Sequence, residues 1–415
     1  MPQKKKILIV AESINVEDSS GSKANVALIQ NLKDAGFEVV VYHYTRKEIQ
    51  LPGIKCVAIK EKRFNTIFLL SRIQRKLQHG LKINLAKHLE PVFGFSFTFF
   101  NDVKSIAAAL KREKDFKPDI VLTLSKGASF RPHFGLLHTP EFHNKWMSYI
   151  HDPYPFHYYP EPYNWSEPGY EQKIRFFEKV SRKCQWAAFP SQLLKEWMGG
   201  FYPAFKGKGV LIPHQLREEN ELVEVPAYFD PEKFNLLHAG NLMKQRDPFP
   251  LIQAFQVFLK KHPDAATKAR LLLVGNASYH ISALKKKEQE IEQLVVSDGY
   301  VPYDRVLKMQ EKASANIILE SAAEVSPFLP GKFPHCIASK RPILHLGPEK
   351  SEVRRLLGSS YEYYAEANDV EEISAKLQKL YEKWKEDPES LQLNRGDLHS
   401  YLSRNYLKKE IENLI

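Results

Sequence analysis

The side chains best suited to chemistry in this sequence are basic residues in turns rich in glycine and proline. Lys332 directly follows Pro330 and Gly331 in the segment 326–344, SPFLPGKFPHCIASKRPIL. Glycine can adopt a backbone shape closed to other residues, and the prolines limit the alternatives. We therefore expect the turn to hold the Lys332 ammonium group and its neighbouring amides in place. Preset donors of this kind stabilise negative charge on a departing group such as a phosphate.

A second basic turn lies in residues 238–255, HAGNLMKQRDPFPLIQAF. Gly240 and Asn241 follow a predicted strand, and Arg246 stands close to a predicted helix start. Gly240 would let a ligand approach the backbone, and helix N-terminal N–H groups favour phosphate oxygens. The Arg246 guanidinium could clamp a diphosphate through two hydrogen bonds. Neighbouring Lys244 could also face the ligand, or it could instead be a solvated surface residue.

Two further strand ends carry turns, Gly275-Asn276 and Val301-Pro302. Such turns expose backbone N–H and C=O groups that could recognise the edge of a planar base. Ordinary turn chemistry explains the same residues, and both interpretations stay open.

In the first half, His151 and Asp152 end a predicted strand, WMSYIHD, and an aromatic loop containing Tyr154 and Tyr158 follows. Aromatic faces stack on sugar rings and apolar chains, and a histidine there can bond a hydroxyl group. A packed loop with a satisfied histidine is the alternative.

Another small-residue loop, SSGSKAN, contains Gly21 and Ser22 and precedes a predicted helix. It lacks the full GxGxxG pattern, so a dinucleotide-cofactor fingerprint is not supported. The sequence also lacks GxxxxGK[ST], GxSxG and HExxH, and its histidines are not spaced as metal ligands. We predict no metal site.

The elements that position these residues alternate between strand and helix. In the first half, apolar strand patterns are separated by amphipathic helix patterns, which indicates βαβ units and a parallel sheet. The strand patterns are 4–12, 37–44, 117–125, 146–152 and 185–191, and the helix patterns are 26–36, 103–115 and 171–183. Ligands of such sheets bind beyond the carboxyl ends of the strands.

The same alternation restarts at Phe234, which predicts an α/β chain of two doubly wound, Rossmann-like domains facing a cleft. The domains are residues 1–215 and 234–394, joined by a linker, 216–233, of acidic and aperiodic composition. The final residues, 395–415, have a helical pattern and could pack back on the first domain.

The composition limits the partners. The chain has 415 residues, a formal net charge of +11 and three isolated cysteines, which fits a cytoplasmic protein with anionic partners. Residues Lys60–Leu89 mix Phe, Ile and Leu with many basic residues, which suits an interfacial helix on an anionic membrane. A packed helix with a solvated basic face is the alternative. No RNA-binding sheet motif appears, and we predict no nucleic-acid partner.

Together these segments resemble the GT-B glycosyltransferases of the retaining group 1 (family 4) type, over nearly the whole chain. The likeness is strongest from Phe234 to Leu344, in the order and spacing of the 238–255, 299–319 and 326–344 segments. It implies transfer of a sugar from a nucleotide diphosphate donor, UDP- or GDP-linked, to an acceptor with retained anomeric configuration. No cofactor or divalent metal is expected, because basic side chains take the metal's electrostatic role.

The resemblance also implies residue roles. Arg246 and Lys332 would neutralise the diphosphate, Gly240 would admit the donor, and the backbone near Val301 would meet the base. The loop at Gly21 would face the diphosphate.

His151 would approach the transferred sugar. Two positions depart from the family pattern, His335 where a ribose-binding glutamate is common and Asn241 where an arginine is common. The family's upstream carboxylate could correspond to Glu320, to Glu324 or to neither.

The leading hypothesis is therefore a hexosyltransferase peripheral to the inner face of the plasma membrane. It would act on a lipid-linked or polysaccharide acceptor in cell-surface polysaccharide or glycolipid synthesis. The alternatives are a nucleotide-sugar 2-epimerase of GT-B fold and a noncatalytic nucleotide-sugar-binding protein.

Overall fold

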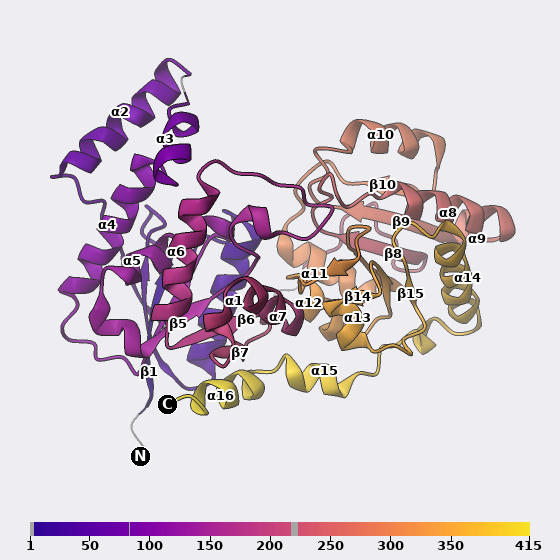
Figure 1. The fold of residues 1–415 in the computed structure, drawn as a ribbon. Coiled ribbons are helices and arrows are strands. Elements are labelled where there is room, and N and C mark those ends of the chain that lie inside the picture. Colours follow the sequence, from indigo (N-terminus) through magenta and orange to yellow (C-terminus); the bar gives the residue numbers. More distant parts are fainter. Residues whose placement is uncertain (1–3, 83, 217–222) are drawn as a thin grey trace. The chain divides into compact units, whose positions relative to one another are not determined.

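Two parallel β-sheets organise the chain, each with helices on both faces (Figure 1). The structure, a computed structural model, describes residues 4–82, 84–216 and 223–415. The first unit takes in the chain up to Tyr159 together with Asn164–Gln215 and Ser403–Ile415. The second unit consists of Pro160–Tyr163 and Leu216–Leu402.

The first unit is built on a seven-stranded sheet of order β3-β2-β1-β4-β5-β6-β7, in which every neighbouring pair is parallel. Its strands are β1 (Lys6–Ala11), β2 (Glu38–His43), β3 (Lys55–Ala58), β4 (Ile120–Leu124), β5 (Trp146–Tyr149), β6 (Trp186–Phe189) and β7 (Gly209–Leu211). Its helices are α1 (Ser20–Asp34), α2 (Thr66–Gly80), α3 (Ala86–Phe93), α4 (Phe97–Arg112), α5 (Arg131–Leu137), α6 (Tyr170–Lys183), α7 (Gln192–Phe201) and α16 (Arg404–Glu412).

The second unit repeats this plan with a six-stranded parallel sheet of order β10-β9-β8-β11-β13-β15. Its strands are β8 (Phe234–Ala239), β9 (Ala269–Val274), β10 (Leu294–Val296), β11 (Ala315–Leu319), β13 (Ile343–Leu346) and β15 (Tyr364–Ala365), and β12 (Val325–Ser326) pairs separately with β14 (Lys350–Ser351). Its helices are α8 (Phe249–Lys261), α9 (Ala265–Lys268), α10 (Ile281–Glu290), α11 (Tyr303–Lys312), α12 (Phe333–Ala338), α13 (Glu352–Leu357), α14 (Val370–Glu386) and α15 (Gly396–Tyr401). Short 3₁₀ helices span Gly127–Ser129, Pro140–Lys145, Phe156–Tyr158, Pro203–Phe205 and Pro388–Ser390.

In both sheets the chain starts at a central strand, runs to one edge and then returns to fill the other. The predicted doubly wound architecture is therefore confirmed in each unit. The direction reverses between β1 and β4 in the first unit and between β8 and β11 in the second, which are the positions where such sheets bind ligands.

Burial explains why these segments form central strands. All six residues of β8 and all five of β4 and β11 are buried, as expected for strands covered on both faces. Within β1, Leu8 and Val10 pack into one core and Ile7 and Ile9 into another, because successive side chains point to opposite faces.

The end of the chain packs on the first unit. Leu407 and Ile411 of α16 are buried in the core that also contains Ile29 and Leu32 of α1. Of the predicted linker, residues 223–233 form no helix or strand, and 217–222 lie outside the described residues.

Two local predictions need correction. The loop SSGSKAN is largely helical, because Ser19 caps α1 by accepting a hydrogen bond from the Ser22 amide at 3.1 Å. The basic segment Lys60–Leu89 does not form one helix, since α2 ends at Gly80 and α3 begins at Ala86. Within the described part of the chain, no helix is both long and apolar enough to cross a bilayer.

Candidate phosphate-binding site

Two strand-end turns in the second unit are locked together by their backbones. Gly240, after β8, donates its N–H to the carbonyl of Val274 at 2.8 Å, and Leu242 donates to Asn276 at 2.9 Å. Gly275, after β9, has φ +125°, and a Cβ atom there would lie 2.6 Å from the Gly240 carbonyl oxygen. Only glycine tolerates this contact and this φ, so Gly275 allows the two turns to pack closely against each other.

Lys332 lies against this pair of turns. It precedes α12, and its Nζ donates a hydrogen bond to the carbonyl oxygen of Ile317 on β11 at 3.0 Å. A Cβ atom on Gly240 would lie 3.6 Å from the same Nζ, so the ammonium group sits beside the turn after β8. Burial, with the positive charge of Arg246 adding to it, lowers the pKa of Lys332 to about 7.

Arg246 and His238 complete a cluster of basic groups. The Nε of Arg246 is buried and has no hydrogen-bond partner among the described residues, and the same is true of the Nδ1 of His238 on β8. Burial and the charges of Lys332 and Arg246 hold the pKa of His238 well below its usual value, so its ring is neutral. His238 was not among the predicted site residues, although it stands two residues before Gly240 on the predicted strand.

The cluster carries positive charge with no carboxylate paired to it. Among the described residues, neither Lys332 nor Arg246 forms an ion pair with Asp or Glu within 4.0 Å. Cations packed together without a counter-ion repel each other and are costly to bury. A bound anion would remove that cost. A diphosphate beside the Gly240 turn would supply negative charge and oxygen atoms that accept hydrogen bonds from these cations.

The expected helix N-terminus does not contribute in the way we predicted. The carboxylate of Asp247 already accepts a hydrogen bond from the Phe249 amide at the start of α8, at 2.9 Å. A phosphate at that position would meet a like charge. The basic side chains, rather than the α8 terminus, are therefore the candidate anion-binding groups of this turn.

The turn around Lys332 also differs in shape from the prediction. Gly331 does not have a positive φ, and a Cβ atom built on it would meet no described atom within 4 Å. The expectation that it needs a backbone shape closed to other residues is wrong. Pro330 is half-buried and Gly331 is exposed, so this backbone remains open to a ligand.

Two polar side chains beside the site are bonded to each other. His335 on α12 is buried, and its Nε2 contacts the hydroxyl group of Tyr303 on α11. Val301 is half-buried and Pro302 exposed just before α11, and Asn241 is exposed beside Gly240. A ribose or base at this edge would therefore meet Tyr303 and His335 as a bonded pair.

Of the two carboxylates considered, Glu320 is buried and Glu324 is exposed. Glu320 directly follows β11, accepts a hydrogen bond from Ser326 at 2.6 Å and lies 2.7 Å from Nε2 of His345. This buried pair ties the end of β11 to β13. The negative charge of Glu320 also favours the protonated form of Lys332.

In the first unit, His151 follows β5 and is held by Asn25 of α1. Its Nε2 lies 3.1 Å from the Asn25 side-chain oxygen, and the Asn25 amide donates to the Ser125 carbonyl at 2.9 Å. The Asn25 oxygen must therefore accept, which makes Nε2 the protonated nitrogen of His151. Burial, with the ring of His214 adding to it, holds the pKa of His151 well below its usual value, so the histidine is neutral.

The remaining first-unit candidates divide into buried and accessible residues. Tyr154 is 2% exposed and packs its ring on Phe130 and Phe177, which favours a role in the core, and we leave it out of the acceptor site. Tyr158 is half-buried and stacks on Phe201 with ring centroids 3.9 Å apart, while Asp152 is half-buried.

Gly21 and Ser22 lie in the first turn of α1. A Cβ atom on Gly21 would lie 3.3 Å from the Gly127 amide nitrogen. Ser22 is fully buried, and its hydroxyl group bonds the Ser19 hydroxyl at 3.1 Å. Only the backbone of Gly21 therefore remains a candidate for ligand contact.

Comparison with known proteins identifies the fold. No protein-family model matches the sequence, and no curated protein matches it. Solved structures do match over 99% of this chain, among them a glycosyltransferase from Rickettsia africae ESF-5 (TM-score 0.61, 14% identity, 98% of that chain). Others are the E. coli trehalose-6-phosphate structure bound with UDP-2-fluoro glucose (0.60, 11%, 99%) and Anabaena Alr3699/HepE with UDP and glucose (0.59, 10%, 98%).

These neighbours are GT-B glycosyltransferases, and the chain shares their fold. The predicted GT-B fold class is thereby confirmed. At these identities the likeness establishes the fold alone.

Proposed function

We propose that this chain is a glycosyltransferase that moves a hexose from a nucleotide diphosphate donor to an acceptor with retention of anomeric configuration. The observation that carries the proposal is the basic cluster of Lys332 and Arg246 beside the Gly240 turn, which has no carboxylate partner among the described residues. It lies at the end of β8, next to the position where the second sheet reverses direction. The UDP named with the E. coli and Anabaena neighbours supports a UDP donor, and GDP is the other base to test.

The proposed step breaks the bond between the anomeric carbon and the diphosphate oxygen. The electron pair stays with that oxygen, so the departing nucleotide gains negative charge next to the Lys332 ammonium and the Arg246 guanidinium. The acceptor oxygen forms the new bond to the anomeric carbon from the same face, and its proton passes to the departing phosphate. Fixed cations beside the departing oxygen lower the barrier because they need little rearrangement.

In this proposal the basic side chains do the work that a divalent cation does in other phosphate-transfer sites. No cofactor is needed, since the donor carries its own activated group. Within the described residues, no three His, Cys, Asp or Glu side chains gather as a metal-binding group.

The remaining parts of the proposal concern the sugar, the base and the acceptor. Neutral His151, with its proton held on Nε2 by Asn25, would present the other ring nitrogen as an acceptor for a hydroxyl of the transferred sugar. Tyr303 and His335 would meet the ribose, and the backbone at Val301 the base. The acceptor would be lipid-linked or a polysaccharide, at the inner face of the plasma membrane, in the synthesis of a surface polysaccharide or glycolipid.

The test is an assay of nucleotide release. The protein is incubated with UDP- and GDP-sugars, with and without a membrane extract as the source of acceptor. We expect released UDP or GDP that depends on the extract, and a product of the same anomeric configuration as the donor. Replacement of Lys332 by alanine should lower release by about 100-fold or more, whereas replacement of exposed Lys244 should not.

Two other outcomes would replace the proposal. Exchange of the sugar at C2 without any acceptor would identify a 2-epimerase. Donor binding without turnover in any extract would identify a noncatalytic nucleotide-sugar-binding protein.

A further inference from the structure

An unusual distribution of side chains marks α2 and α3 in the first unit. Twelve large hydrophobic side chains are exposed in the described part of the chain, and seven of them belong to residues 64–93. We call these seven the α2–α3 surface; they are Phe64, Leu69, Leu70, Ile73, Leu81, Val92 and Phe93. The other five are all Tyr or Phe, so every exposed Leu, Ile and Val of this set lies on the α2–α3 surface.

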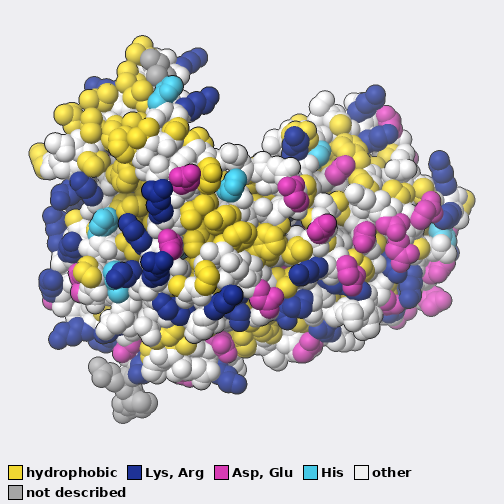
Figure 2. All heavy atoms as spheres, in the orientation of Figure 1, with side chains coloured by type: hydrophobic (Ala, Val, Ile, Leu, Met, Phe, Trp, Pro, Cys, Tyr) yellow, Lys and Arg dark blue, Asp and Glu magenta, His cyan; other side chains and the backbone are white. Residues whose placement is uncertain are grey.

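The sidedness of α2 is the reverse of that expected for a helix on a globular domain. Its two buried residues are polar, Ser71 and Gln74, whereas Leu69 is 61% exposed and Ile73 is 45% exposed. A surface helix ordinarily turns its apolar stripe toward the core. Here that stripe faces outward, and Figure 2 shows the hydrophobic side chains gathered over this part of the molecule.

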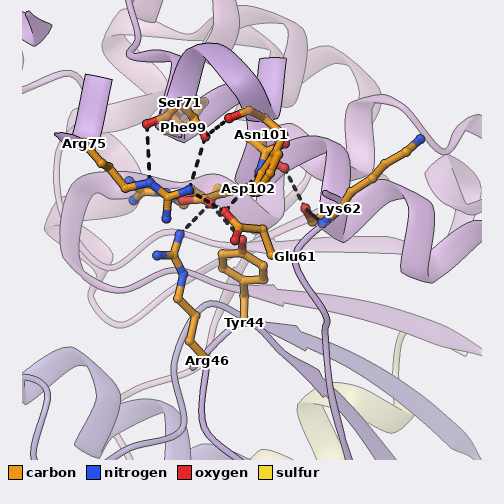
Figure 3. Close-up of polar contacts among 12 residues, drawn as sticks. Tyr44, Arg46, Glu61, Lys62, Ser71, Arg75, Phe99, Asn101 and Asp102 are labelled. Atoms are coloured by element: carbon orange, nitrogen blue, oxygen red, sulfur yellow. Dashed lines mark hydrogen bonds and ion pairs between the residues drawn. The ribbon is translucent and has the colours of Figure 1, made fainter. Parts of the chain in front are cut away.

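The polar side of α2 is fixed to the unit by specific hydrogen bonds (Figure 3). Arg75 donates to Glu61 at 2.9 Å and to the Ser71 hydroxyl at 3.3 Å, and Asn101 of α4 donates to the same Glu61 oxygen at 3.2 Å. Gln74 accepts a hydrogen bond from the Phe97 amide at 3.1 Å. These contacts hold the helix with its polar side inward, so the outward apolar stripe is a property of the folded unit.

The charge around the surface is mainly positive, since its two neighbouring acidic residues, Glu61 and Glu90, are half-buried and paired with Arg75 and Lys173. Residues 62–89 contain seven Lys or Arg and no Asp or Glu. Arg72 and Lys76 are both exposed on α2. Arg72 lies directly before exposed Ile73, and Lys76 lies three residues after it. Apolar side chains mixed with basic ones on an exposed helix are the features of a helix that lies in a membrane interface.

We propose that the α2–α3 surface docks on the surface of an anionic phospholipid bilayer, with Leu69 and Ile73 entering the headgroup boundary. Burying this apolar area supplies binding strength, and the basic residues select anionic lipid. The docking itself does not depend on sugar transfer. Its use, to bring the site to a lipid-linked acceptor, rests on the proposed function.

The test is cosedimentation of the full chain with vesicles of phosphatidylcholine alone and of phosphatidylcholine with phosphatidylglycerol. We expect binding to the anionic vesicles and weak or no binding to the neutral ones. The double replacement Leu69→Ser with Ile73→Ser should weaken binding at least about tenfold, since it removes apolar area that enters the interface. Arg72→Gln with Lys76→Gln should also weaken it about tenfold or more.

Matched controls come from the second unit. Lys260→Gln with Lys268→Gln removes the same charge from exposed sites on α8 and α9, and Tyr279→Ser removes a side chain that is 62% exposed. Neither should change vesicle binding. Unchanged circular dichroism and thermal unfolding of every variant would show that folding is intact.

The remaining outcomes overturn the inference. Wild-type protein that ignores anionic vesicles, or serine variants that bind them as well as wild type, would exclude docking by this surface. Self-association in sedimentation equilibrium that the serine variants abolish, without vesicle binding, would assign the surface to a second copy of the chain. Vesicle binding with no binding of UDP or GDP would refute the proposed function and leave the membrane inference standing.

Discussion

The replacement Lys332→Met should make the ligand-free protein more stable while it removes the proposed function. Methionine has about the length of lysine without its charge. Burial lowers the pKa of Lys332 from 10.5 to about 7. At about 1.4 kcal/mol for each pKa unit, this fall corresponds to a cost of about 5 kcal/mol for keeping the ammonium protonated in the folded state.

The sign of the pH dependence follows from proton binding. The pKa of Lys332 is lower in the folded state than in the unfolded state, so the unfolded state binds more protons between about pH 7 and 10.5. The cost is full below that window and disappears as the pH rises through it. At about pH 6 it is about 5 kcal/mol, and at about pH 9 it has fallen to about 2 kcal/mol.

The methionine variant also leaves the Ile317 carbonyl without the Nζ donor, which costs about 1–3 kcal/mol at every pH. The net gain at about pH 6 is then about 3 kcal/mol. The difference between the gains at about pH 6 and about pH 9 should stay close to 3 kcal/mol, because the carbonyl cost cancels.

Urea unfolding of both proteins at the two pH values, followed on the transition of the second unit, measures this difference. Lys244→Met is the control, since that lysine is exposed and its loss should change stability by less than about 0.5 kcal/mol at either pH. Isothermal titration with UDP and GDP should show the opposite order, with the more stable Lys332→Met variant binding the nucleotide more weakly. A stability gain that is equal at both pH values would refute the view that a strained buried charge marks this site.

Three further predictions concern the same site. Arg246→Ala and Lys332→Ala should each lower turnover by about 100-fold or more with unchanged circular dichroism, because each removes a cation beside the departing phosphate; activity retained in both would exclude the assignment. Gly275→Ala should destabilise the protein by about 2 kcal/mol or more, because its Cβ would lie 2.6 Å from the Gly240 carbonyl oxygen. The control is Gly331→Ala, which has open space for the Cβ and should shift the unfolding free energy by less than about 0.5 kcal/mol. EDTA should leave nucleotide release unchanged, and a loss that added Mg²⁺ restores would show that the basic residues do not replace a metal.

Several features of the fold follow from local patterns in the sequence. The buried strands β1, β4, β8 and β11 appear as short apolar runs ended by small or polar residues, and the helices between them show a 3.6-residue period. Their alternation is enough to predict two doubly wound sheets, because parallel strands need helical crossovers.

Backbone shape and burial were less predictable. The sequence could not tell that Gly331 lacks a left-handed conformation or that Tyr154 packs in the core, since both depend on what surrounds the residue. It showed that α2 is amphipathic, but not which face the unit would bury. That choice depends on polar partners from Glu61, Phe97 and Asn101.

By itself, the sequence determined the alternating elements, the glycine turns after the strands and the two cations, Arg246 and Lys332, because local periodicity and residue type carry this information. Only the tertiary structure decided that these cations lie together with His238 beside the Gly240 turn, and that neither pairs with a carboxylate among the residues that the structure describes. The reason is physical: pairing of β11 beside β8 brings Ile317, and the lysine bound to it, next to Gly240. This proximity arises from strand order and packing, which bring together residues far apart in the chain. No local sequence pattern encodes it.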